Sequence, residues 1–440
     1  MRRALASLLL LASLCSTVAA QTPPTGGERP GGEVADLVNA LLGALMGGGS
    51  VTGASLQAEV AEAGGIPFQR DVPVAFLGRA ELVAYLRELI DAEYPVAQAR
   101  ADERLLLAFD LLPAGTDLRA LRARLLEDNV AGFYDERPDR RRLYAVSEDR
   151  SFTPMNQIVL AHELRHALQD QYRDLHAQLG EDVTDFDDRR LAWMSLLEGD
   201  ATLVMERFVK QRLGLPGGDD GLGAGMDSAG LGAPGLFDLP DAPPVIRDHL
   251  MQPYLAGLGL ARAIWARGGA SAMRDAWGRA PLSMEQVLHP SRYFAGEPPR
   301  RLVPRILPTP GARLLSEGTL GELLLRSLLE AGGESAAEGW GGDAWRLYDI
   351  AGKTLLVWRS EWDSSSDAHE FARALHERFA RRTTREPSRD GFEVFRSASG
   401  WLFAIRSQPD AVELVSGDDP LSVVKALAAA AQGSGLEMTH

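Results

Sequence analysis

The chain has 440 residues, of which 45% are hydrophobic and 24% charged, so it can bury a large core and is not disordered throughout. Its formal net charge is −15. An acidic chain lacks the positive field that attracts phosphate backbones, so we expect no general binding to nucleic acid.

The first 20 residues have the pattern of a secretory signal peptide. Two arginines precede an apolar run, and small residues precede the polar Gln21. The alternative of a membrane anchor is disfavoured because the run is shorter than the ~20 residues that span a bilayer. Lipidation at Cys15 is a second alternative, but Leu14 is bulky where that signal needs a small residue. We expect cleavage after Ala20 and a secreted or periplasmic protein without membrane attachment.

The cysteine content limits the chemistry of any site. Cys15 is the only cysteine and belongs to the predicted signal peptide. The mature chain therefore offers no disulfide and no thiolate ligand. A metal ion would have to be held by His, Asp, Glu or backbone oxygen.

The first part of the mature chain changes from flexible to structured. Residues 21–70 are rich in Gly, Pro and Ala and predict a flexible segment, within which 37–46 is either a short helix or part of a pro-segment. From 71 to 128, apolar residues recur at spacings of three and four, which predicts helices. Residues 130–146 hold two aromatic and β-branched runs around a polar turn, which predicts a hairpin.

The strongest predicted helix begins at Thr153-Pro154. Threonine suits the N-cap and proline the first helical position. We expect this helix to run to about Leu179, with Gly180 as its stop, and a second helix to cover about 189–213. Residues 214–244 are dominated by Gly, Asp, Pro and Ala and predict a long loop, either a linker or a mobile flap.

The remainder of the chain predicts two more helices and then a mixed tail. The helices are expected at about 246–277 and 320–329. The tail has an α+β pattern, with strands at 354–358, 392–395, 401–405 and 412–415 and helices at 366–381 and 420–431.

The segment that indicates chemistry is His162-Glu163-Leu164-Arg165-His166 on the strongest helix. Residues four apart lie on one helical face, so the imidazoles of His162 and His166 can point at one ion. Two imidazoles half fill a tetrahedral zinc site. Glu163 lies beside them, where its carboxylate can take a proton from a metal-bound water. A surface helix that carries these residues by coincidence is the alternative.

A catalytic zinc site needs a third protein ligand and one open position. Glu198, on the next predicted helix, shares a face with apolar residues, and a buried carboxylate needs a partner such as a metal. The alternative is a buried salt bridge with an arginine. Asp200 is a second candidate ligand; we expect it instead to accept a hydrogen bond from a ligand imidazole. Gly199 between them indicates that another backbone or the ion needs room there.

With its His162-Glu163-x-x-His166 motif followed by Glu198 in a Glu-Gly-Asp-Ala setting, the chain resembles the gluzincins, the thermolysin-like zinc metallopeptidases. The resemblance covers roughly 130–210, and the wider layout is similar to uncharacterised secreted bacterial proteins with this motif. It implies a mainly helical zincin-like core with a small sheet over 71–305. The pattern of the tail predicts a C-terminal α+β domain over 306–440, so we expect an α+β fold. The resemblance also implies Zn²⁺ as cofactor, a peptide or protein substrate, and a role for the 130–146 hairpin in holding extended peptide. The gap between His166 and Glu198 is longer than in the thermolysin type, so the third ligand is the weaker assignment.

Gluzincins commonly use a Tyr or His to stabilise the developing oxyanion, and the resemblance makes Tyr254 and His289 the candidates. A packing or capping role is the alternative for both. For the whole chain, the alternatives to a peptidase are a metal-stabilised envelope binding protein without catalysis and a zinc hydrolase of a non-peptide amide or ester.

Overall fold

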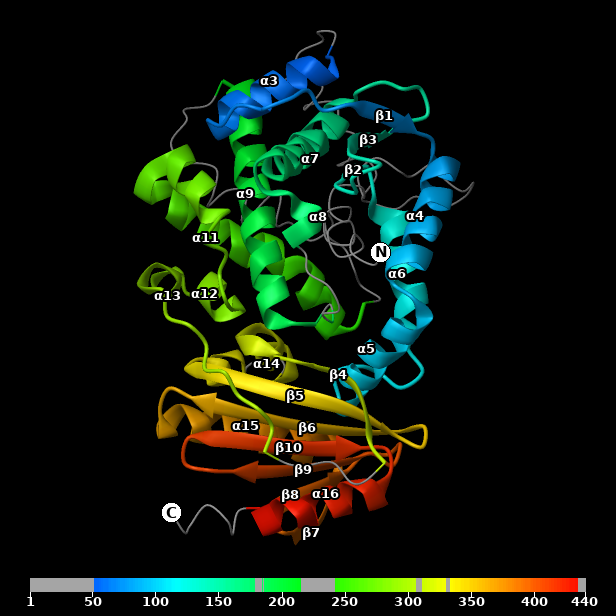
Figure 1. Ribbon diagram of the computed structural model, residues 1–440, viewed down its shortest axis with the longest axis vertical. Helices are drawn as coiled ribbons and strands as arrows, with labels where there is room; N and C mark the ends of the chain where they lie inside the picture. The colour runs from blue at the N-terminus through cyan, green and yellow to red at the C-terminus, as the bar shows by residue number, and fades with distance from the viewer. Residues whose placement is uncertain are drawn as a thin grey trace, which may run out of the picture.

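The computed structural model describes residues 51–178, 184, 186–214, 242–305, 311–329 and 333–433. The predicted signal peptide, the 37–46 segment and most of the 214–244 loop lie outside these residues. The fold is α+β, as predicted: a helical part with a three-stranded sheet lies above a seven-stranded sheet in Figure 1. None of the described helices has the length and apolar character needed to cross a membrane.

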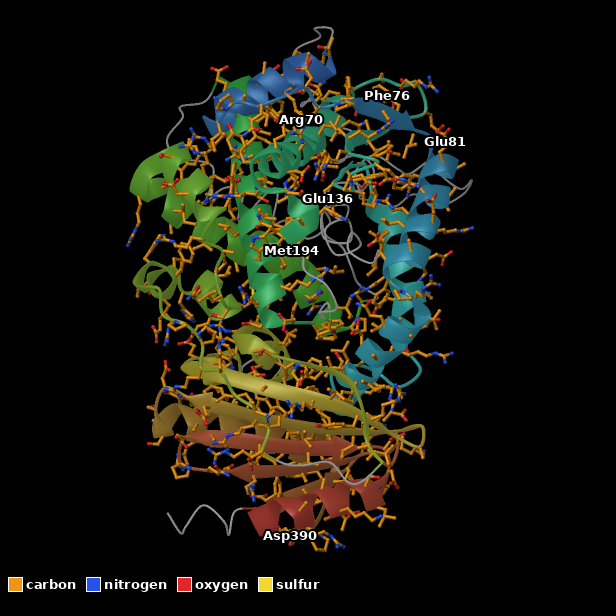
Figure 2. The ribbon with its side chains drawn as sticks, in the orientation of Figure 1. Arg70, Phe76, Glu81, Glu136, Met194 and Asp390 are labelled. Carbon is orange, nitrogen blue, oxygen red and sulfur yellow. The ribbon has the colours of Figure 1, made fainter. Side chains whose placement is uncertain are left out.

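Three long helices form the centre of the helical part. They are α7 (Pro154–Arg173), α9 (Asp188–Arg212) and α11 (Pro244–Ala276), and α9 packs against both of the others. Side chains fill the space between these helices. Met194 of α9, labelled in Figure 2, is only 2% exposed. The short helices α12 (Met284–Leu288) and α13 (Pro290–Ala295) follow α11.

The motif helix begins as predicted but ends earlier. The Thr153 hydroxyl accepts from Asn156 N at 3.2 Å, so threonine is the N-cap. Asp174 leaves helical geometry, with φ 8° and ψ 81°, and the four-residue helix α8 (Leu175–Gln178) follows. Asp170 Oδ1 accepts from Leu175 N at 2.9 Å, which stabilises the break. The prediction of one helix to Leu179 was wrong because the Asp170 carboxylate binds the N–H of Leu175, which a continuing helix would have bonded to a backbone carbonyl.

The predicted flexible segment 21–70 contains a helix, α3 (Gly53–Gly64), so that prediction was wrong for these residues. The hydroxyl of Thr52 accepts from Ser55 N at 3.1 Å, and Ser55 Oγ accepts from Thr52 N in return, which forms a capping box. Leu56 and Val60 are fully buried in a core shared with α7 and α9. The helix forms because four-residue spacing buries these side chains, which overrides the glycine-rich composition around it.

The small sheet has the order β1-β3-β2. Strands β2 (Gly132–Asp135) and β3 (Arg142–Val146) are antiparallel and confirm the predicted hairpin. Strand β1 (Val74–Leu77) pairs parallel with β3 and lies in the region predicted to be helical. Strand β2 is an edge strand and packs on α7. The same region also contains three helices, as predicted: α4 (Arg79–Glu93), α5 (Val96–Ala108) and α6 (Leu118–Asn129).

The C-terminal part is a seven-stranded antiparallel sheet with the order β4-β5-β6-β10-β9-β8-β7. Side chains alternate along β6: Trp358 lies in the core with α14 and α15, whereas Val357 lies in the core with α16. The strands are β4 (Arg313–Gly318), β5 (Trp340–Ile350), β6 (Lys353–Trp362), β7 (Thr384–Arg389), β8 (Phe392–Arg396), β9 (Leu402–Ser407) and β10 (Ala411–Gly417). The helices are α14 (Gly321–Leu329), the 3-10 turn Glu334–Ala337, α15 (Ser365–Arg382) and α16 (Pro420–Gly433).

The two parts share one core. Phe109 of α5 packs edge-on against Trp358 of β6, with ring centroids 6.0 Å apart, and Ile246 of α11 belongs to the same cluster. Arg104 of α5 donates to Asp349 at the end of β5 at 2.8 Å. The seven-stranded sheet therefore packs against the helical part. The sequence pattern changes near residue 306, where the boundary was predicted, but the hydrophobic core continues across it.

Candidate metal centre

Three side chains from α7 and α9 converge on one point. The Nε2 atoms of His162 and His166 are 3.0 Å apart, and Glu198 Oε2 lies 3.1 Å from the first and 3.5 Å from the second. Ligand atoms bound at about 2.05 Å in a tetrahedron lie roughly 3.3 Å apart. The three separations therefore fit a single small ion. Within the described ranges this is the only group of three His, Cys, Asp or Glu side chains that could share one.

The helices place these ligands through a close backbone contact. His162 and His166 are one turn apart on α7, whereas Glu198 points from α9. A Cβ built on Gly199 would lie 2.0 Å from the carbonyl oxygen of Gly257 on α11. Glycine is thus required beside Glu198 because another backbone occupies that space, which is one of the two explanations expected from the sequence.

Burial and the neighbouring side chains shift the pKa values of His162 and Glu198. His162 is 6% exposed, and burial lowers its pKa despite the nearby Glu198. Burial acts to raise the pKa of Glu198, but the His166 and His162 imidazoles outweigh this and lower the pKa to about 2. The site therefore favours a neutral His162 imidazole and an ionised carboxylate, the forms in which these groups bind metals.

One oxygen of Glu198 has no hydrogen-bond partner among the described residues. Glu198 is fully buried, and its Oε1 accepts no hydrogen bond from any part of the chain that the structure describes. A buried carboxylate oxygen without a partner carries a large desolvation cost. A cation between the three side chains would offset that cost, so the donor set fits a metal on grounds independent of the distances.

Glu163 is held against the small sheet. Its Oε2 accepts from Tyr134 N of edge strand β2 at 3.0 Å, and the side chain is 1% exposed. Burial raises its pKa well above the usual range, the Glu198 charge adds to this, and the Tyr134 N–H opposes it. The carboxyl thus lies on the same helix as the two imidazoles, in an environment that makes it a better proton acceptor than a solvent-exposed glutamate.

Asp200 does not contact either imidazole, contrary to the prediction. Its carboxylate accepts from Arg165 at 2.9 and 3.0 Å, from Gln169 Nε2 at 2.8 Å and from Trp277 Nε1 at 3.0 Å. Gln169 Oε1 in turn lies 2.8 Å from His166 Nδ1. The amide of Gln169 therefore stands between the acid and the ligand. Gln169 was not predicted as a site residue, because a glutamine three residues beyond the second histidine carries no signal of its own.

The two candidate oxyanion residues are placed differently. Tyr254 of α11 stacks on His162, with ring centroids 5.9 Å apart and planes 26° apart, so it lies at the metal group. His289 lies between α12 and α13, and its Nε2 is 3.0 Å from Glu322 of α14. None of the hydrogen bonds or ring contacts that the structure gives His289 reaches the metal group. The structure brings Tyr254 to the site and does not bring His289 there.

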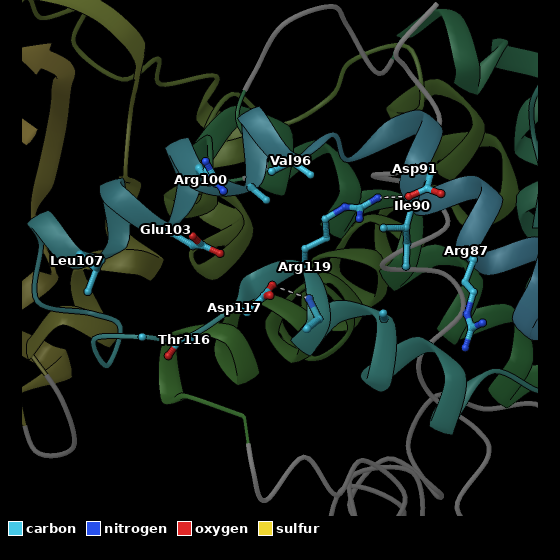
Figure 3. A pocket seen from close by; sticks show the side chains of 14 residues that line it. Arg87, Ile90, Asp91, Val96, Arg100, Glu103, Leu107, Thr116, Asp117 and Arg119 are labelled. Carbon is cyan, nitrogen blue, oxygen red and sulfur yellow. Dashed lines mark hydrogen bonds and ion pairs between the residues drawn. The ribbon is translucent and has the colours of Figure 1, made fainter. Parts of the chain in front are cut away.

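A separate hollow of about 740 Å³ lies between α4, α5 and α6 (Figure 3). Several of its charged side chains have partners: Arg119 pairs with Asp91, Glu103 accepts from Leu118 N, and Asp117 accepts from Ala120 N. None of the residues that line the hollow belongs to the metal group. The metal centre is the stronger candidate site because its three buried side chains converge on one point.

Comparison with known proteins gives one partial match. Residues 312–434, which include the seven-stranded sheet, match a family described as a domain of unknown function (DUF8575). No curated protein and no solved structure matches the chain.

Proposed function

We propose that this protein is a zinc-dependent peptidase that acts outside the cytoplasm. The observation that carries the proposal is the convergence of His162 Nε2, His166 Nε2 and Glu198 Oε2 within 3.0 to 3.5 Å. Two imidazoles and one carboxylate are a ligand set of catalytic zinc sites, in which a fourth position stays open. The location rests on the signal-peptide pattern of residues 1–20.

The chain's own groups have distinct parts in such a reaction. Bound zinc would polarise the scissile carbonyl and lower the pKa of a water molecule. Glu163, fixed by Tyr134 N at 3.0 Å, would accept the proton of the attacking water and pass it to the leaving amine. Tyr254, stacked on His162, would stabilise the developing oxyanion.

The edge strand supports a peptide rather than another amide as the substrate. Among the strands that the structure describes, β2 pairs only with β3, and it carries Tyr134, whose N–H holds the proposed base. An extended peptide can add to such an edge through backbone hydrogen bonds. This would bring a scissile bond alongside Glu163.

The test uses protein recovered from the extracytoplasmic fraction, where we expect a mature chain that begins at Gln21. Metal analysis should give about one zinc per chain, and a chelator should abolish cleavage of a casein-type substrate. Glu163→Gln should retain zinc but lose at least about 100-fold in activity, because it removes the proton acceptor and leaves the ligands. Glu317→Gln is the matched control: Glu317 is an exposed residue of β4 that pairs with Arg346.

Other results of these experiments would contradict the proposed mechanism or indicate a different function. Activity that survives Glu163→Gln would refute the mechanism. Zinc without cleavage of any peptide pool would indicate a metal-stabilised binding protein, and cleavage confined to esters or small amides would indicate a non-peptide hydrolase. Iron in place of zinc would also contradict the proposal, since two histidines and one carboxylate can hold ferrous iron.

A further inference from the structure

We propose that Gln169 is the positioning residue of the metal centre: its side-chain amide fixes the tautomer and the ring orientation of His166. The inference rests on the proposed function, because it assigns His166 as a ligand. It adds a residue that neither the motif nor the family match points to.

The orientation of the amide follows from its partners. Gln169 Nε2 lies 3.1 Å from the carbonyl oxygen of Leu197 and 2.8 Å from Asp200 Oδ2, and both of these atoms only accept hydrogen bonds. The nitrogen end must therefore face α9, which leaves Oε1 facing His166 Nδ1 at 2.8 Å. An amide oxygen can only accept, so His166 carries its proton on Nδ1. In the neutral imidazole, which is the form that binds metals, the lone pair is then on Nε2, the atom that faces His162 and Glu198.

The amide itself cannot rotate away. Asp200, which holds its nitrogen, is fixed by two hydrogen bonds from Arg165 and one from the Trp277 indole. Gln169, Asp200 and Arg165 are all fully buried, so water does not compete for these bonds. Asp200, paired with Arg165, also polarises the amide and strengthens the bond that Oε1 accepts from the imidazole. A charge that sits two hydrogen bonds from the ligand thus supports its metal-binding form.

The test compares the same substitution at two sites on one helix. Gln169→Met keeps the side-chain length but removes the acceptor for His166. Gln157→Met is the control: Gln157 is also buried on α7, and it donates to the carbonyl of Phe152 at 3.1 Å. The readouts are the zinc dissociation constant, from competition with a chelator, and the unfolding midpoint of the metal-free protein. We expect Gln169→Met to weaken zinc binding by about 10- to 100-fold, as for other partners of metal-ligating histidines, and Gln157→Met to leave it unchanged.

A third variant separates positioning from packing. Gln169→Glu keeps an acceptor for His166 but removes the donor to Asp200 and brings two carboxyl groups together. We expect its metal-free form to be less stable than that of Gln169→Met, yet its zinc affinity to stay closer to the wild-type value. Equal loss of zinc affinity in Gln169→Met and Gln169→Glu would overturn the inference, as would wild-type affinity in Gln169→Met. Wild-type protein that binds no zinc would overturn the proposed function as well, so the two failures are distinguishable.

Discussion

At the scale of single residues, the metal centre depends on an ion pair that never touches the metal. Arg165 and Asp200 are fully buried, and two hydrogen bonds join the guanidinium to the carboxylate. The guanidinium also lies 4.9 Å from the Trp277 ring. Removing one partner of a buried pair leaves the other charge without compensation, which costs far more than the pair contributes when it is intact.

Arg165→Met should therefore lower the free energy of unfolding of the metal-free protein by about 3–5 kcal/mol. Arg346→Met makes the same change in a half-exposed ion pair, between Arg346 of β5 and Glu317 of β4. It should lower the free energy of unfolding by less than about 1 kcal/mol. Denaturant unfolding of both variants measures the difference. Equal losses of unfolding free energy in the two variants would contradict the prediction, because they would show that other groups compensate the Asp200 charge when Arg165 is absent.

Part of the site was accessible from the sequence. The spacing of His162, Glu163 and His166 depends on helical geometry alone, and Glu198 could be found because a carboxylate on an apolar helical face needs a partner. The partner of Asp200 could not be found in this way. Arg165 and Gln169 reach it from α7 only because of how α7 and α9 pack, and a sequence pattern does not specify that packing.

At the scale of elements, the separation of α9 from α11 controls where Glu198 lies. Gly199 and Gly257 face each other so closely that a Cβ on Gly257 would lie 2.1 Å from the carbonyl oxygen of Ser195. The obstacle is backbone in both directions, so neither helix can relieve a clash by turning a side chain. A larger residue at either position must push the helices apart.

Gly199→Ala should therefore destabilise the protein by about 1–3 kcal/mol or more and weaken zinc binding, because Glu198 would move with α9. Gly259→Ala on α11 is the control: a Cβ there meets nothing within 4 Å, so alanine should stabilise the helix by up to about 1 kcal/mol. Thermal unfolding and chelator competition measure both effects. A Gly199→Ala variant that is as stable as wild type would mean that the helices do not approach this closely in solution.

The elements that the sequence analysis missed share a physical reason. Strands β4 and β7 are edge strands that contain no buried residue. The side chains of β7 are mostly polar, the two leucines of β4 are adjacent, and two glycines follow the first residue of β5, so these strands lack the apolar alternation that identifies a strand. The strands that were predicted, such as β6 and β10, are central and nearly continuously buried. The strands that were not predicted form because they pair with neighbouring strands of the sheet. That pairing depends on the tertiary fold and leaves no local pattern in the sequence.

At the scale of the whole molecule, the C-terminal sheet is anchored to the helix that carries Glu198. The first residue of α9, Asp188, donates its backbone N–H to the carbonyl of Thr319, and its carboxylate accepts from Met284 N at 3.0 Å. Asp343 of β5 accepts from the backbone nitrogens of Leu320 and Gly321 at 2.9 and 2.8 Å. The start of α9 and the start of β5 are thus tied to the same turn, which adds to the core that the two parts share.

A molecule joined in this way should unfold as one unit, so a ligand bound at α7 and α9 should protect the distant sheet. Zinc at about 100 times its dissociation constant should add about 2.7 kcal/mol to global stability and slow amide hydrogen exchange in β5 and β6 as well as in α7 and α9. Glu198→Gln should abolish the slowing in both places, because it weakens the site and leaves the sheet untouched. Slowing confined to α7 and α9 would contradict the prediction and mean that the sheet unfolds separately, despite the contacts of Phe109 and Arg104 with Trp358 and Asp349.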